Sequence, residues 1–139
     1  MSAFSTKKGL GIVAAVAATA LAFGVALPAQ AASDDQTLKI QGIIPLTGSL
    51  SFLSPPEIAG LHLAVDEINA AGGVLGNKVS LTISDSGDGD TLSIADQSAT
   101  KALANKADVV VGAAASGVTR SIINKITGAK VIQISMSNT

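Results

Sequence analysis

Residues 38–76 constrain the fold of this chain more than any other segment. Their sequence is LKIQGIIPLTGSLSFLSPPEIAGLHLAVDEINAAGGVLG. The apolar stretch Leu38–Ile44 predicts a strand, and apolar residues at helical spacing predict a helix over about Pro55–Ala71. Ser54 is expected to cap that helix, with Glu57 completing a capping box. A buried strand followed by a polar loop and an amphipathic helix predicts the first unit of a parallel sheet.

The rest of the chain repeats this alternation of apolar stretches and helix-periodic segments. Further strands are expected at about Lys78–Ser84, Asp108–Val111 and Lys130–Ile134, with helices at about 91–105 and 117–127. This order predicts an α/β fold with a doubly wound parallel sheet. Because its crossovers are right-handed, the turns after all four strands are expected along one rim, where ligands bind in open parallel sheets.

The turn after the third strand is the most suggestive of these for binding. The segment Gly112–Thr119 resembles a phosphate loop in outline, but Val118 occupies the place of the essential lysine, so phosphate binding is disfavoured. Ser116 would lie at a helix N-terminus, where a hydroxyl and free backbone N–H groups suit an anion such as a carboxylate. An N-cap role for Ser116 explains the same pattern equally well.

No set of residues predicts catalysis or metal binding. Asp85, Asp88 and Asp90 lack the spacing and the glutamate of a calcium loop, so we expect a solvated turn with Asp90 capping the second helix. His62 is the single histidine and there is no cysteine, which leaves no partner for a triad or a zinc site. We therefore expect no enzyme activity, no metal and no cofactor.

Residues 1–31 have the three parts of a cleavable signal peptide. Lys7 and Lys8 precede an apolar stretch, and Pro28 is followed by the A-x-A site Ala29–Ala31. We expect cleavage before Ala32 and, since no cysteine is present for lipid attachment, a periplasmic or secreted product. Seven basic residues then face ten acidic ones, and this mild acidity argues against a nucleic-acid partner.

Five segments, taken in order, resemble one known family. They are LKIQGIIPLTGSL, GLHLAVDEINAAGGVLG, the loop ISDSGD, VVVGAAASGV and VIQISMSNT. Together they resemble the substrate-binding proteins of branched-chain amino acid ABC transporters, of the leucine/isoleucine/valine-binding type with periplasmic binding fold type I. The resemblance implies two α/β lobes that close on a small ligand and present it to a membrane permease.

The resemblance also implies particular ligand-binding residues. Ser116 matches the family serine that binds the α-carboxylate of the amino acid, and Ala115 precedes it on the pocket wall. Ser137 and Thr139 match positions that contact the ligand's amino and carboxylate groups. Phe52 falls in the loop where some members place an aromatic ring over the ligand.

We accordingly expect residues 32–139 to be the N-terminal, incomplete part of the first lobe of an amino-acid-binding or amide-binding protein. As a fragment it is expected to bind amino acids weakly and to associate through its uncovered apolar strands. Two alternatives stay open at this point. A sensory receptor domain of the same fold would carry a downstream membrane helix, and a secreted enzyme would need a nucleophile–base pair or a metal cluster.

Overall fold

The computed structural model describes residues 36–138. The expected signal peptide and the predicted ligand contact Thr139 lie outside the described residues. Within them the chain alternates strands and helices as expected. The strands are β1 (Lys39–Ile44), β2 (Ser80–Asp85), β3 (Val109–Gly112) and β4 (Ile132–Ile134); the helices are α1 (Ser54–Ala70), α2 (Leu92–Ala104) and α3 (Ser116–Gly128), with a 3-10 turn η1 (Ser51–Leu53) before α1.

The four strands form one parallel sheet in the order β2-β1-β3-β4. β1 lies in the interior and pairs with β2 from Lys39 opposite Ser80, and with β3 from Ile40 opposite Val109. The chain therefore moves outward from β1 on one side to β2, returns, and continues on the other side through β3 and β4. This reversal of strand order confirms the doubly wound α/β prediction, and it lies between β1 and β3.

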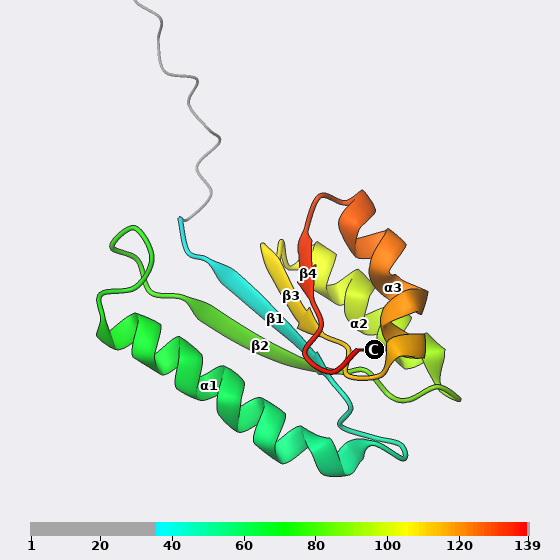
Figure 1. Cartoon of the computed structure of the whole chain (residues 1–139). Coiled ribbons are helices and arrows are strands. Elements are labelled where there is room, and N and C mark those ends of the chain that lie inside the picture. Colours follow the sequence, from blue (N-terminus) through cyan, green and yellow to red (C-terminus); the bar gives the residue numbers. More distant parts are fainter. Residues whose placement is uncertain (1–35, 139) are drawn as a thin grey trace, which may run out of the picture. The chain divides into compact units, whose positions relative to one another are not determined.

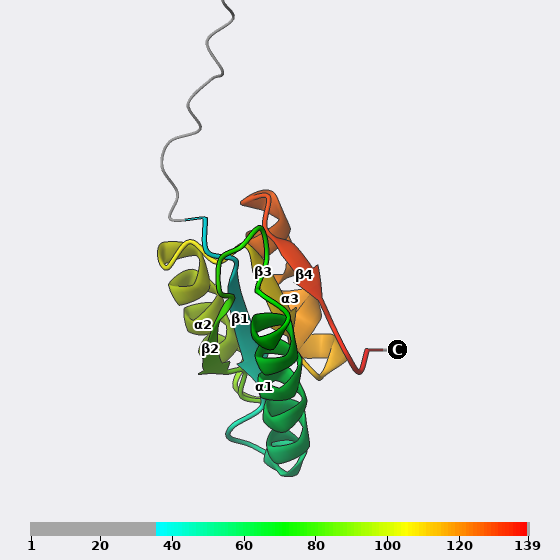
Figure 2. The same cartoon turned by 90° about the vertical axis from the view of Figure 1, so that its left-hand side faces the viewer.

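Helices cover both faces of the sheet, as Figure 1 shows from the front and Figure 2 after a quarter turn. α1 packs over β1 and β2 on one face, whereas α2 and α3 lie side by side on the other face. Because all the strands are parallel, their carboxyl ends lie at one edge of the sheet.

The main core lies between the sheet and the α2–α3 pair. Its aliphatic centre includes Ile43, Val110, Ile122 and Ile126, none of which has exposed side-chain area. α2 contributes only small residues to it, namely Ala95, Ala99 and Ala102. Small side chains let a helix lie close to the sheet, which explains how a core with no aromatic residue is filled.

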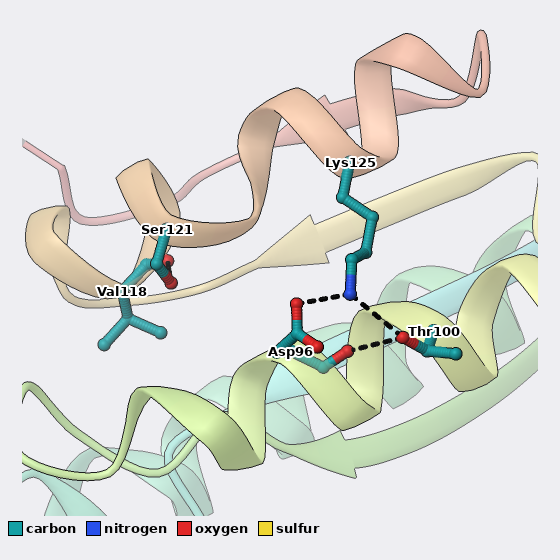
Figure 3. A network of polar contacts seen from close by, with 5 residues as sticks. All are labelled: Asp96, Thr100, Val118, Ser121 and Lys125. Carbon is teal, nitrogen blue, oxygen red and sulfur yellow. Dashed lines mark hydrogen bonds and ion pairs between the residues drawn. The ribbon is translucent and has the colours of Figure 1, made fainter.

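Polar contacts join α2 to α3 at the surface (Figure 3). The Lys125 ammonium of α3 forms an ion pair with Asp96 and donates to the Thr100 hydroxyl at 3.1 Å, and both partners lie on α2. The Asp96 side chain is 54% exposed, so this pair adds only about 0–1 kcal/mol of stability. The helices are held together mainly by their buried residues.

Part of the α1 face of the sheet is uncovered. Val110 points into the core, so its neighbours Val109 and Val111 point to the opposite face, together with their register partners Ile132 and Ile134 on β4. α1 does not lie over these strands, and Ile132 and Ile134 are 61% and 54% exposed. Apolar strand residues are therefore left in contact with solvent beside the rim.

The cap prediction at the start of α1 was wrong. Ser54 does not cap α1: its hydroxyl donates to the Pro45 carbonyl at 2.5 Å, because η1 leads directly into the helix and occupies the place of a cap. On α3, Ile123 is 39% exposed. The buried stripe of that helix runs through positions 118, 122 and 126, four residues apart.

Candidate functional site

The candidate site is the rim formed by the turns after the four strands. The strand order reverses between β1 and β3, and in folds of this kind ligands bind beside the carboxyl ends of the strands at such a reversal. The turn after β1 passes through Thr47 and Ser49, and the turn after β3 is built from Ala113, Ala114 and Ala115. Ala113 and Ala114 are buried, and Ala115 is half-buried at the start of α3.

The turns after β3 and β4 are joined through backbone carbonyls. The Ala113 carbonyl accepts hydrogen bonds from the hydroxyls of Thr119 at 2.9 Å and Ser135 at 2.7 Å. The Gln133 amide donates to the neighbouring Gly112 carbonyl at 2.9 Å. These bonds bring the segment after β4 against the N-terminus of α3.

The turns after β1 and β2 are joined by two carboxylates. Asp85 accepts from the backbone N–H groups of Leu46 and Thr47 at 2.9 and 3.2 Å, and from the Thr47 hydroxyl at 2.5 Å. Asp88 accepts from the Ser49 backbone N–H at 2.9 Å. The loop after β1 is thereby fixed to the loop after β2.

Both carboxylates favour their ionised forms. Burial of Asp85 on its own would oppose ionisation, but the bonds from the Thr47 hydroxyl and from the N–H groups of Gly87, Thr47 and Leu46 outweigh burial and lower its pKa. The Ser49 N–H, with the Thr91 hydroxyl, likewise lowers the pKa of Asp88.

The expected solvated turn is therefore wrong for Asp88, which is only 8% exposed. The cap prediction for Asp90 is wrong as well. Thr91 is the N-cap of α2 and makes no side-chain cap bond, while the Asp90 N–H donates to Asp88.

We expect Asp85→Asn to destabilise the folded chain by about 1–2 kcal/mol at pH 7, because the Thr47 hydroxyl and N–H groups lose a charged acceptor. The folded-state pKa of Asp85 is depressed, so its contribution is present above the ordinary value of 3.8 and is lost as the pH falls through the folded value. Melting temperatures of the two proteins should converge below that value. Asp90→Asn, at an exposed site, is the control, and equal losses in both variants would contradict the role of Asp85.

The structure brings together the turns after β3 and β4, and both turns carry predicted ligand contacts. Ala115 has extended backbone geometry at the N-cap of α3, so Ser116 is the first residue of the helix and not its cap. Ser137 lies in the segment after β4 and is exposed. Phe52 lies in η1 at the loop after β1 and is 70% exposed.

One buried acidic group was not predicted. Glu57 lies in the first turn of α1, and its Oε2 atom is buried without a hydrogen-bond partner among the described residues. Burial raises the pKa of Glu57, although the Ser137 side chain acts in the opposite direction.

The described residues form surface depressions away from the turn after β3. The largest, of about 350 Å³, is lined by residues of β2 and α2 such as Asp85 and Lys101. None of the three is lined by the predicted ligand contacts Ala115, Ser116, Ser137 or Phe52.

The described residues show no group of three or more potential metal ligands. His62 is exposed on α1. Among residues 36–138, no helix has the length and apolarity needed to cross a membrane.

Solved structures contain the same arrangement. The branched-chain amino acid transporter substrate-binding protein LivJ from Streptococcus pneumoniae, in complex with isoleucine, superimposes with a TM-score of 0.67 at 35% identity, over 75% of this chain and 30% of that one. A leucine-binding protein LivK from Thermotoga maritima gives a TM-score of 0.65 at 25% identity, over 74% and 28%.

Sequence comparison leads to the same group of proteins. Leu/Ile/Val-binding protein homolog 8 of Brucella abortus (strain 2308) is 47% identical over 51 residues, or 37% of this chain and 13% of that protein. The chain thus aligns with only a small part of the length of the relatives it matches. Residues 37–139 match the family described as periplasmic binding protein. With its parallel sheet, its rim and this match, the chain belongs to the periplasmic binding protein family.

Proposed function

We propose that this chain forms part of the ligand-binding lobe of an extracytoplasmic solute-binding protein that captures an amino acid for an ABC transporter. The observation that carries the proposal is the rim at the strand-order reversal, where Ser116 opens α3 behind three alanines. A helix N-terminus attracts negative charge through its free N–H groups and its dipole. A small carboxylate fits there because no large side chain of the alanine turn blocks its approach.

The proposed class of ligand rests on the polar groups of the rim and on the ligand of a related protein. The rim offers N–H and hydroxyl groups to a carboxylate, and LivJ of S. pneumoniae was solved with isoleucine. We propose a branched-chain or related amino acid, with its carboxylate at Ser116 and Ala115 and its remaining contacts at Ser137, Thr139 and Phe52. A membrane permease is the proposed receiving partner.

Calorimetric titration tests this function. In a chimera, residues 37–138 would replace the matching segment of S. pneumoniae LivJ, which supplies the second lobe. We expect the chimera to bind L-isoleucine with a Kd on the order of micromolar, and the 139-residue chain to bind with a Kd of about 1 mM or weaker, because the open rim leaves the ligand in water.

2-Methylbutylamine, which is isoleucine without its carboxylate, is the control ligand and should not bind the chimera measurably. A folded chimera that does not bind isoleucine, or that binds 2-methylbutylamine equally well, would contradict the proposal.

Export is proposed on the signal-peptide pattern of residues 1–31. Expression in a Gram-negative host is expected to yield a periplasmic product that begins at Ala32, because Pro28 ends the apolar stretch and Ala29–Ala31 forms the cleavage site. Edman sequencing of the periplasmic fraction checks this start. Material that keeps Met1 and sediments with membranes would contradict it.

A further inference from the structure

A polar depression lies at the edge of the sheet opposite the rim, where β1 and β2 begin and α2 ends. It has a volume of about 290 Å³, and it is lined by two pairs of register partners, Lys39 with Ser80 and Gln41 with Thr82. Ile43, two residues after Gln41, belongs to the core beside α2, so both pairs lie on the α2 face of the sheet. The length of the strands separates this depression from the rim.

The end of α2 forms one wall of the depression. Asn105 is the C-cap of α2, and the buried Ala107 follows it on the connection to β3. The Ala107 N–H donates to the Ala102 carbonyl at 3.0 Å, so this wall is fixed to the last turn of the helix. Ser80 and Thr82 are exposed, and the depression is therefore open to solvent beside β2.

Gln41 is a buried polar residue on this surface. It is only 2% exposed, and its amide nitrogen donates to the Gly42 and Thr82 carbonyls, both at 3.1 Å, and to the Ser84 hydroxyl at 3.0 Å. Three acceptors around the nitrogen fix the orientation of the amide. Its oxygen, Oε1, accepts no hydrogen bond from residues 36–138, so a water or a ligand has to supply the donor.

Neighbouring side chains in the depression also have unused hydrogen-bonding groups. The Ser80 and Thr82 hydroxyls and the Asn105 side-chain amide form no hydrogen bond with another described residue. In the larger depression beside β2, by contrast, the Ser84 and Ser98 hydroxyls are both bonded within the protein. Polar groups from β1, β2 and the end of α2 therefore converge here without partners in the protein.

The chemistry of these groups selects the class of ligand. Hydroxyls and side-chain amides both donate and accept hydrogen bonds, and the hydroxyls of a polyol do the same. Oε1 of Gln41 requires a donor, which an ionised carboxylate lacks. Among the described residues that line the depression none is acidic, whereas Lys39 is basic, so a cationic ligand is disfavoured.

We propose that this depression binds a small neutral polyol of up to about monosaccharide size. Oε1 of Gln41 accepts a hydrogen bond from one ligand hydroxyl, and Thr82 and Asn105 exchange hydrogen bonds with others. The site is at the amino ends of the strands, away from Ser116, so a polyol does not compete with an amino acid at the rim. The inference does not rest on the proposed function.

A titration followed by ¹H–¹⁵N NMR tests the site on the full chain, with xylitol as the probe. We expect saturable shifts of the side-chain amide signals of Gln41 and Asn105, with a Kd on the order of 1–10 mM for a ligand of about ten heavy atoms. 1,5-Pentanediol keeps the chain length but lacks the three inner hydroxyls, so it should cause no saturable shift. Melting temperatures are unsuitable here, because excluded osmolytes stabilise folded proteins without binding.

Substitutions on the open side of the depression test single contacts without disturbing the core. Thr82→Val removes an exposed hydroxyl and keeps a β-branched side chain on the strand. It should weaken xylitol binding about three- to tenfold, which corresponds to loss of one ordinary hydrogen bond. Thr127→Val, which removes an exposed hydroxyl on α3 outside the depression, is the matched control and should leave the Kd unchanged.

Three results would overturn the proposal. The first is a set of shifts that grow linearly with xylitol concentration and do not saturate. The second is an equal saturable response to 1,5-pentanediol, which would show that the hydroxyl pattern is not recognised. The third is a Thr82→Val protein that binds xylitol with the Kd of the wild type.

Discussion

Gly112→Ala is expected to destabilise the folded chain by roughly 3 kcal/mol or more, through both strain and a backbone clash. Gly112 ends β3 with a φ of +123°, a conformation that side chains strongly disfavour. A Cβ there would lie 2.1 Å from the carbonyl oxygen of Ile43 and 3.0 Å from its carbon, and both atoms belong to the interior strand β1. Neither can move without disturbing the sheet.

A thermal melt measures this effect, with an expected fall in Tm of about 12–24 °C for a domain of this size. Gly117→Ala is the matched control, because nothing lies within 4 Å of the place its new methyl group would take and its backbone is helical. That variant should melt at or slightly above the wild-type temperature, since alanine favours the helix. A Gly112→Ala protein that melts within about 2 °C of the wild type would refute the clash argument.

Ser116→Ala should weaken isoleucine binding to the LivJ chimera by about ten- to a hundredfold, because a hydrogen bond to a charged group contributes roughly 1.5–3 kcal/mol. The backbone N–H groups at the start of α3 stay in place, so binding should weaken and not vanish. Ala115, and not Ser116, has the N-cap geometry, so the melting temperature should hardly change.

Ser121→Ala is the control for Ser116→Ala. Ser121 lies on the same helix, and its hydroxyl donates to the Val118 carbonyl within that helix at 2.7 Å (Figure 3). Equal isoleucine affinities for the wild-type chimera and its Ser116→Ala variant would show that the Ser116 hydroxyl does not bind the ligand.

Local pattern was sufficient to predict the fold because each strand and helix carries its own periodicity. Every predicted strand and helix is present with its ends within two residues, and the parallel order follows from their alternation. The rim was predictable for the same reason, since parallel strands with right-handed crossovers share one carboxyl edge.

The contacts within the rim were not predictable in this way. Asp85 and Asp88 bond to residues 38 or 39 positions earlier. Asp90 looked like a cap because it precedes a helix, but Asp88 takes the local hydrogen bonds of that turn. These side chains join loops that are far apart in sequence, so no pattern in the neighbouring residues predicts their contacts.

The interior position of β1 has a consequence for biosynthesis. β1 is translated first, yet its partner Val109 in β3 follows Ile40 by 69 residues. At about 5–20 residues per second, a ribosome needs roughly 3–14 s to deliver the second neighbour of that strand. Until then the nascent chain cannot complete its sheet. Placing the earliest strand in the middle of the sheet therefore delays its completion until β3 has been made.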